Sequence, residues 1–145
     1  VRVRGEVDSN LPRVYGDFQQ LTQVFLNIVL NALDAMPDGG ELTIAIRIAK
    51  GRERIEIDFT DTGIGMPEQV VASVFDPFFT TKSGAKGTGL GLSVSQGIIR
   101  QHGGDIVAES APGVGTTFTV QLPVAMVPAE IPQTEAEDPE EAPIT

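Results

Sequence analysis

The stretch QVFLNIVLNALDA, from Gln23 to Ala35, decides the fold of this chain. Apolar side chains surround it almost completely, which predicts a helix with a buried face, running from Phe18 to Ala35 with Asp17 as its N-cap. Polar residues interrupt the hydrocarbon at helical spacing and fall on one narrow face: Gln23, Asn27, Asn31 and Asp34. Asparagine is a poor residue for a helix interior unless its amide has a partner, so this stripe indicates a binding edge. A solvated edge of a core helix is the alternative, although Lys and Glu would suit it better.

Strand and helix patterns alternate around this segment. A short helix is predicted from Pro67 to Val74 and a long one from Gly89 to Gln101, which ends at a left-handed cap in Gly103-Gly104. The predicted strands, each with alternating or continuous apolar residues, are Val1–Val7, Leu42–Ala49, Ile55–Thr60, Ile106–Glu109 and Thr116–Leu122. This order predicts an α+β fold, a two-layer α/β sandwich with helices on one face of a mixed, largely antiparallel sheet.

Length and composition limit the classes of protein. The chain has 145 residues, which fits one folded domain at residues 1–123. Residues 124–145 are rich in Pro and Glu, and every charged residue there is acidic, which predicts a disordered tail or linker. The net charge of −10 argues against nucleic acid as a partner. The absence of cysteine excludes disulfides and thiol chemistry, and no apolar run is long enough to span a bilayer, so no direct membrane contact is expected.

The motif DTGIGMP, residues 61–67, follows a predicted strand directly. An aspartate at the end of a buried strand can accept a hydrogen bond from an exocyclic amine such as that of adenine. Gly63 and Gly65 would let a flat base approach the backbone closely. The alternative interpretation of Asp61 is an ordinary turn residue.

Two further motifs point to phosphate. GTGLGLS, residues 87–93, opens a helix with three glycines, and exposed N–H groups at a helix start bind anions; a glycine hinge is the alternative. FDPFFTTK, residues 75–82, precedes a polar stretch that contains glycine, as an aromatic anchor precedes a lid. Lys82 and Lys86 are the only cations between Arg54 and Arg100, and both could reach a phosphate; exposed surface lysines are the alternative.

These four motifs, in this order, resemble the N box, first glycine box, F box and second glycine box of histidine kinases. Those kinases belong to the ATPase group that includes gyrase B, heat-shock chaperones and MutL, and that has the Bergerat ATP-binding fold. The resemblance covers nearly all of residues 10–123, and the closing HGGDIVAES and PGVGTTFTVQLP also match. The F box and second glycine box look most like those of the nitrogen-regulation type of sensor kinase.

The resemblance implies roles for individual residues toward ATP and Mg²⁺. Asn31 should ligate the Mg²⁺ that bridges the phosphates, and Asn27 should support that ion or the phosphates through water. Lys82 should contact a phosphate, and these three are the candidate catalytic residues. Asp61 should bind the adenine amino group, and Thr116 should join the water network around it, unless Thr117 does. The remaining candidate nucleotide contacts are Asp34, Gly63, Gly65, Phe79, Gly87, Thr88, Gly89, Leu90 and Gly91.

Asn27 separates this chain from the hydrolytic relatives, which have a glutamate at that position as the base for water. An amide is not basic near neutral pH, so the resemblance implies that ATP is held with negligible hydrolysis and that its γ-phosphoryl group passes to a histidine. That histidine would lie on a separate dimerisation domain of the same parent kinase. A response regulator would be an indirect partner of this chain. We expect the isolated domain to be a cytoplasmic monomer, whether or not its parent is anchored in a membrane. The alternatives are a gyrase- or chaperone-type ATPase, and an anti-sigma-type serine kinase or nucleotide-sensing module.

Two neighbouring positions on the first long helix depart from the family pattern. Many kinases of this family have a cation and a tyrosine where this chain has Asp34 and Ala35, so the usual residue types for one phosphate contact and one adenine stack are missing from this helix. His102 is the single histidine, but its context IIRQHGG is a helix C-terminus, which predicts a structural role rather than phosphate acceptance.

Overall fold

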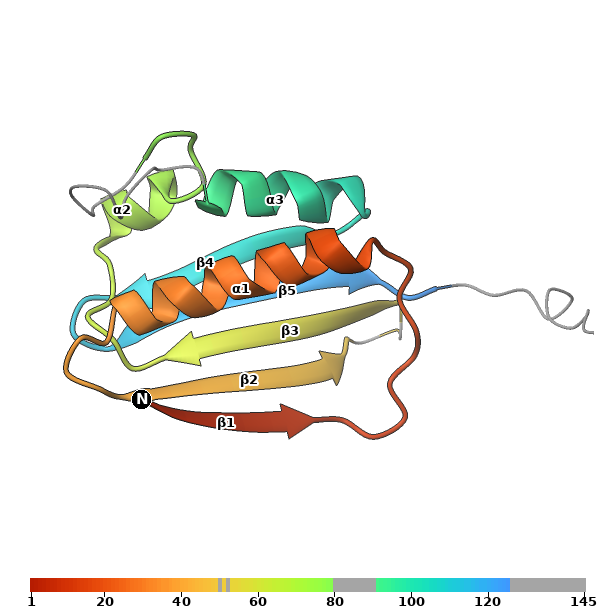
Figure 1. Ribbon diagram of the computed structural model, residues 1–145, viewed down its shortest axis with the longest axis horizontal. Helices are drawn as coiled ribbons and strands as arrows, with labels where there is room; N and C mark the ends of the chain where they lie inside the picture. Colours follow the sequence, from red (N-terminus) through yellow and green to blue (C-terminus); the bar gives the residue numbers. More distant parts are fainter. Residues whose placement is uncertain (50, 52, 80–90, 126–145) are drawn as a thin grey trace, which may run out of the picture.

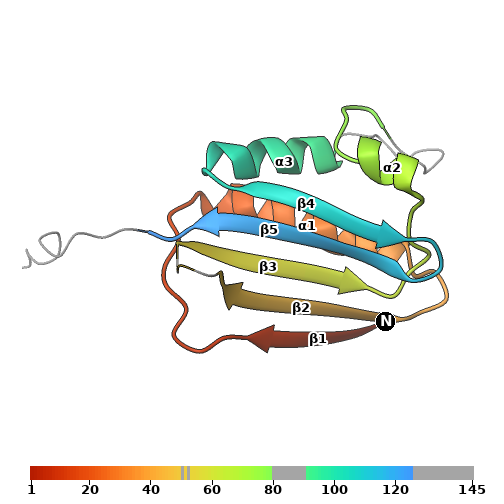
Figure 2. The same cartoon turned by 180° about the vertical axis from the view of Figure 1, so that it is seen from behind.

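The computed structural model describes residues 1–49, 51, 53–79 and 91–125. It contains a five-stranded sheet of order β1-β2-β3-β5-β4, with the helices on one face (Figures 1 and 2). β1 runs parallel to β2, and the other neighbours are antiparallel. The elements are β1 Arg2–Val7, α1 Phe18–Asp34, β2 Glu41–Ile48, β3 Arg54–Asp61, α2 Glu68–Ser73, α3 Gly91–Gln101, β4 Asp105–Ala111 and β5 Gly115–Pro123. The predicted α+β sandwich is thereby confirmed.

α1 is held by its cap and by its apolar face. The Asp17 side chain accepts from the backbone N–H of Gln20 at 3.0 Å, as expected for an N-cap. Val24, Ile28 and Ala32 are buried because their spacing turns them toward the sheet. Beside them the rings of Phe25 and Phe59 lie 5.9 Å apart, so the polar edge of α1 is fixed in place by the packing of its opposite side.

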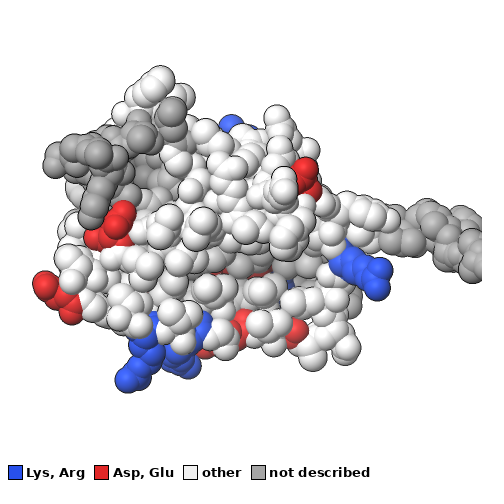
Figure 3. All heavy atoms as spheres, in the orientation of Figure 1, with Lys and Arg blue, Asp and Glu red and all other residues white. Residues whose placement is uncertain are grey.

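The sheet has one apolar and one polar face. Along β3 the buried residues Ile55, Ile57 and Phe59 face the helices, and the residues between them face the other way. On that helix-free face Arg47 pairs with Glu56 at 2.7 Å and with Asp58. On the helix side, the charged side chains lie mainly around the periphery and the surface over α1 is largely uncharged (Figure 3).

Element ends agree with the prediction to within a few residues. Pro67 is the N-cap of α2 rather than its first helical residue. α3 is described from Gly91, and the predicted start at Gly89 lies outside the described residues. Gly103 has a φ of 83°, as the left-handed cap requires. In the described part of the chain, no helix has both the length and the apolar character needed to cross a bilayer.

The end of β5 is tied to the body for two residues beyond Pro123. The backbone N–H of Val124 donates to Glu53 O at 2.9 Å, and that of Ala125 donates to Arg13 O at 2.7 Å. The predicted tail of residues 124–145 thus begins with two residues that are hydrogen-bonded to the body, and its remaining residues, 126–145, lie outside the described residues.

Candidate functional site

The C-terminal end of α1, the end of β3 and the β4–β5 hairpin meet at one end of the molecule, at the left in Figure 1. The backbone N–H of Ile64 donates to Ala35 O at 3.0 Å, so the loop after β3 is attached to the end of α1. Asn31 lies one turn earlier, because its carbonyl accepts from the Ala35 N–H at 3.1 Å. The structure thus brings Asn31 and Asp61 to the same end of the fold.

Asp61 is a buried carboxylate that is held by backbone donors. It is 4% exposed, and its Oδ1 accepts from the N–H groups of Gly63 at 2.9 Å and Thr116 at 3.1 Å. Burial raises the pKa of Asp61, and the two backbone hydrogen bonds lower it in part. Both bonds are made to Oδ1, so Oδ2 is the oxygen that a ligand amine would use. Asp61 is therefore preorganised as an acceptor.

The structure decides between two neighbouring threonines. Thr116 is buried, and its N–H reaches Asp61. Thr117 points to the opposite face, where its hydroxyl lies 3.0 Å from that of Thr60. Because successive strand residues alternate between faces, only Thr116 can join the surroundings of Asp61.

Ser110, which the motifs did not single out, connects the elements around Asp61. Its hydroxyl accepts from the Met66 N–H at 2.8 Å, donates to Gly115 O at 2.9 Å and lies 2.7 Å from the Thr116 hydroxyl. The Gly113 N–H also donates to Ile64 O at 2.7 Å. The loop after β3 is therefore fixed to the β4–β5 hairpin as well as to α1. A serine on the inward face of β4 was the sequence signal for this role.

The two glycines of the DTGIGMP motif, Gly63 and Gly65, are needed for contacts within the protein. A Cβ at Gly63 would lie 2.5 Å from Ala35 O, and one at Gly65 would lie 1.9 Å from Ala111 O. Gly65 also has a φ of 71°, which side-chain-bearing residues rarely adopt. Their missing side chains allow backbone to pack on backbone, which is a different reason from the expected approach of a base.

The polar edge of α1 faces α3. The Asn27 amide nitrogen lies 3.3 Å from Gly91 O and 3.2 Å from the hydroxyl of Ser95, a residue that is 0% exposed. Asn31 is half-buried and Asp34 is exposed, and each has an interaction partner. Gly91 begins α3 as described, which places the end of the second glycine box beside Asn27.

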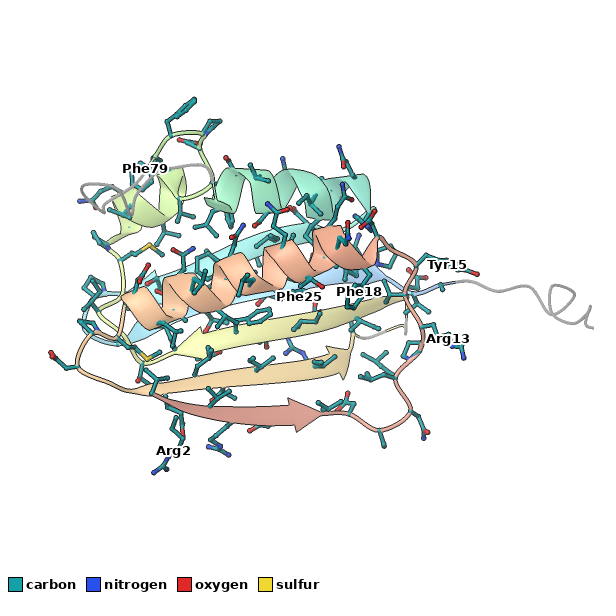
Figure 4. The ribbon with its side chains drawn as sticks, in the orientation of Figure 1. Arg2, Arg13, Tyr15, Phe18, Phe25 and Phe79 are labelled. Atoms are coloured by element: carbon teal, nitrogen blue, oxygen red, sulfur yellow. The ribbon has the colours of Figure 1, made fainter. Side chains whose placement is uncertain are left out.

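The aromatic motif divides between core and surface. Phe75 packs edge to face on Phe118, with ring centroids 6.1 Å apart, whereas Phe78 is 74% exposed. Phe79 is half-buried and ends this described segment (Figure 4). The other predicted phosphate contacts lie outside the described residues: Lys82, Lys86, Gly87, Thr88, Gly89 and Leu90.

His102 has protein partners on both ring nitrogens. Nε2 accepts from the backbone N–H of Asp17 at 3.0 Å, and Nδ1 lies 2.8 Å from Ile98 O. Since a carbonyl only accepts, Nδ1 carries the proton. The ring joins the end of α3 to the cap of α1, and this geometry supports the predicted structural role.

A metal ion at this site would be held by neutral protein oxygens and by the phosphate oxygens of a bound nucleotide. The described residues contain no group of three or more His, Cys, Asp or Glu side chains that could form a metal cage. Asn31 offers an amide oxygen, and Mg²⁺ in proteins often keeps waters and takes phosphate oxygens. The donor set therefore fits Mg²⁺ carried by a nucleotide.

A separate hollow of about 560 Å³ lies on the helix-free face of the sheet. Its lining includes Glu6, Arg47 and Asp58. Arg47 and Thr119 already occupy the Asp58 carboxylate. The hollow lies on the opposite face of the sheet from Asp61 and Asn27, which face the helix side, so we do not assign it to the candidate site.

This fold and site define a class of nucleotide-binding ATPase-like domains. A family model described as "Histidine kinase-, DNA gyrase B-, and HSP90-like ATPase" matches residues 16–126, and the chain belongs to that family. The chain is 47% identical over 114 residues to sensor histidine kinase ZraS of Klebsiella oxytoca, covering 79% of this chain and 24% of ZraS. It is 43% identical over 124 residues to sporulation kinase E of Bacillus subtilis (strain 168), covering 86% of this chain and 16% of that kinase. The chain thus spans a quarter or less of these relatives.

Solved structures agree with this assignment. The nucleotide-free catalytic domain of histidine kinase ThkA matches with a TM-score of 0.73 and 33% identity, covering 85% of this chain and 80% of that one. ThkA has also been solved in complex with the response regulator protein TrrA; that match has a TM-score of 0.69 and 30% identity and covers 85% of this chain and 34% of that one. The resemblance to histidine kinase catalytic domains is therefore confirmed.

Proposed function

We propose that this chain binds Mg-ATP between α1, α3 and the loop after β3, and donates the γ-phosphoryl group to a histidine on a separate domain of the same parent kinase. The observation that carries the proposal is the buried Asp61, whose Oδ1 is fixed by two backbone N–H groups. A buried carboxylate whose Oδ1 is already bonded could accept from the exocyclic amine of adenine through Oδ2. The family assignment supports the same nucleotide.

The proposed roles follow from chemistry and position. Asp61 accepts from the adenine amine, and Thr116 and Ser110 hold its surroundings. Asn31 supplies an amide oxygen to Mg²⁺, which neutralises charge on the phosphates when bound. Lys82 and the glycine-rich segment 87–91 complete the phosphate side. Catalysis of phosphoryl transfer consists mainly of positioning and charge neutralisation. The amide and backbone groups would supply the positioning, and Mg²⁺ and Lys82 would supply the positive charge.

Asn27 favours transfer over hydrolysis. Its amide nitrogen is directed to Gly91 O and Ser95 Oγ, and neither amide atom can take a proton from water near neutral pH. Because water is not activated, the nucleophile is instead the nitrogen of the acceptor histidine. It forms the new bond to phosphorus as the bond to the bridging oxygen of ADP breaks. We further propose a cytoplasmic, monomeric domain of the nitrogen-regulation type, with a response regulator as the indirect recipient.

A calorimetric titration of the domain with ATP, with and without Mg²⁺, tests the binding proposal. We expect saturable binding that Mg²⁺ strengthens, with negligible phosphate release over the same period. Labelled ATP, offered with a helical histidine domain or with a serine-bearing protein, then tests the transfer. Label on the histidine domain supports the proposal. Robust Mg-dependent hydrolysis would favour the gyrase-type ATPase, and label on serine would favour the anti-sigma type.

A further inference from the structure

Ser95 is a polar side chain in the apolar contact between α3 and the rest of the fold. It is 0% exposed, and the residues one turn later on the same helix, Ile98 and Ile99, are buried hydrophobic residues. A buried hydroxyl is costly unless it is hydrogen-bonded. In the neighbouring helix, the Asn27 amide nitrogen donates to the Ser95 hydroxyl at 3.2 Å. The position therefore exchanges apolar packing for one hydrogen bond to α1.

The same contact determines how the Asn27 amide is turned. Gly91 O, 3.3 Å from the amide nitrogen, can only accept a hydrogen bond. An amide turned the other way would set its oxygen against this carbonyl oxygen, so the NH₂ group must face α3. With the two N–H bonds directed to Gly91 O and Ser95 Oγ, the Asn27 oxygen is turned away from these two acceptors.

We propose that Ser95 is a positioning residue that orients Asn27 for Mg-ATP, an inference that rests on the proposed function. Ser95 itself does not touch the nucleotide. By holding the NH₂ group, it directs the Asn27 oxygen to a water of the metal and phosphate shell. Because Gly91 begins α3 directly after the glycine-rich segment, the same bonds join the start of α3 to the polar edge of α1.

The first test measures the orientation without nucleotide. In a ¹⁵N NMR spectrum, the Asn27 side-chain resonances are identified as the pair lost in Asn27→Ala. In Ser95→Ala we expect one of these two amide protons to shift and to exchange faster with solvent, and in Ser95→Thr we expect both to stay protected. Ile99→Val, a buried substitution on the same helix, is the control for lost packing. Unchanged Asn27 resonances in Ser95→Ala would overturn the proposal, whatever the protein binds.

The second test measures binding by calorimetry. Ser95→Ala should raise the Kd for Mg-ATP about 5-fold, the factor that corresponds to one hydrogen bond, and should leave the Kd for ADP without Mg²⁺ unchanged. Ser95→Thr should restore Mg-ATP binding, and Ile99→Val should not affect the ratio of the two Kd values. The double variant with Asn27→Ala should bind no more weakly than Asn27→Ala alone, since the two residues act as one unit.

The outcomes separate this proposal from the proposed function. Wild-type protein that fails to bind Mg-ATP contradicts the proposed function, and the NMR measurement still decides the role of Ser95. Wild-type binding with an equal Kd in Ser95→Ala, additive losses in the double variant, or equal weakening of metal-free ADP would each overturn the positioning role alone.

Discussion

Two aspartates on β3, only three residues apart, have opposite surroundings. Asp58 lies on the helix-free face, where it pairs with Arg47 and accepts from the Thr119 hydroxyl at 2.7 Å. Asp61 lies at the end of the strand on the helix side, buried, with two backbone N–H groups as donors. An odd separation along a strand reverses the face, so the same residue type is a surface ion-pair partner in one case and a preorganised acceptor in the other. A charged side chain therefore compensates the scaffold carboxylate Asp58, whereas within the described part of the chain the candidate ligand carboxylate Asp61 is held by backbone donors.

The largest expected effect comes from removing the charge of each aspartate. Asp61→Asn should raise the Kd for ATP about 100-fold, because hydrogen bonds to a charged group contribute about 1.5–3 kcal/mol and an amide can place a donor against the adenine amine. Asp58→Asn, the matched control, should change the Kd less than about 2-fold. Calorimetry measures both. Equal effects of the two substitutions would remove the distinction between them.

Asn31→Ala tests binding of the metal and phosphates independently of binding of the adenine base. The Kd for Mg-ATP should rise about 10-fold or more, since a metal ligand is lost, whereas the Kd for metal-free ADP should stay the same. Titrations with and without Mg²⁺ provide the comparison. A parallel loss for both nucleotides would show that the substitution damages the fold rather than the metal position.

His102, like Asp58, has protein partners for its polar atoms, so we expect its replacement to change stability and not ATP binding. Replacing it with Ala leaves the Asp17 N–H and Ile98 O without their partner and should lower the free energy of unfolding by about 1–2 kcal/mol. ATP affinity and phosphoryl transfer to a supplied histidine domain should be unchanged. Denaturant unfolding and a transfer assay are the measurements, and loss of transfer by a folded His102→Ala domain would contradict the structural role.

Acidic pH should change the difference in stability between Asp61→Asn and the wild type. Burial raises the pKa of Asp61 above its ordinary 3.8, so the folded state binds this proton more tightly than the unfolded state does. The stability that Asp61 contributes is therefore fully present below pH 3.8 and is lost as the pH rises through the raised value. The unfolding free energy of Asp61→Asn, relative to the wild type, should increase over that interval. A flat difference, measured by urea unfolding at several pH values, would contradict the raised pKa.

Arg47→Ala should have the smallest effect. The guanidinium is partly exposed on the helix-free face, and pairing with Asp58 raises its pKa. We expect a loss of less than about 1 kcal/mol in unfolding free energy, reduced further by salt, and no change in ATP affinity. Thermal unfolding at low and high salt measures the first, and calorimetry the second. A clear loss of affinity would connect the polar sheet face to the site.

The sequence predicted the elements well because their signals are local. The apolar period of α1, the cap at Asp17, the alternation of β3 and the glycine cap at Gly103 each depend on neighbours in the chain. The motif order also predicted the family and the candidate residues Asn31 and Asp61. Ser110 and Ser95 were missed, because each acts across elements that are far apart in sequence.

The sequence by itself determined the class of fold, the family and the residue types that a nucleotide site requires, since periodicity and motif spacing are properties of short segments. Only the tertiary structure decided that Thr116 rather than Thr117 belongs with Asp61, that the DTG glycines serve backbone packing, and that the Asn27 NH₂ group faces α3. These three features depend on the face of the strand or helix on which a side chain lies and on its contacts with residues far away in the sequence. Hydrogen bonds are directional and short in range, so they are set only when the helices and the sheet have packed together.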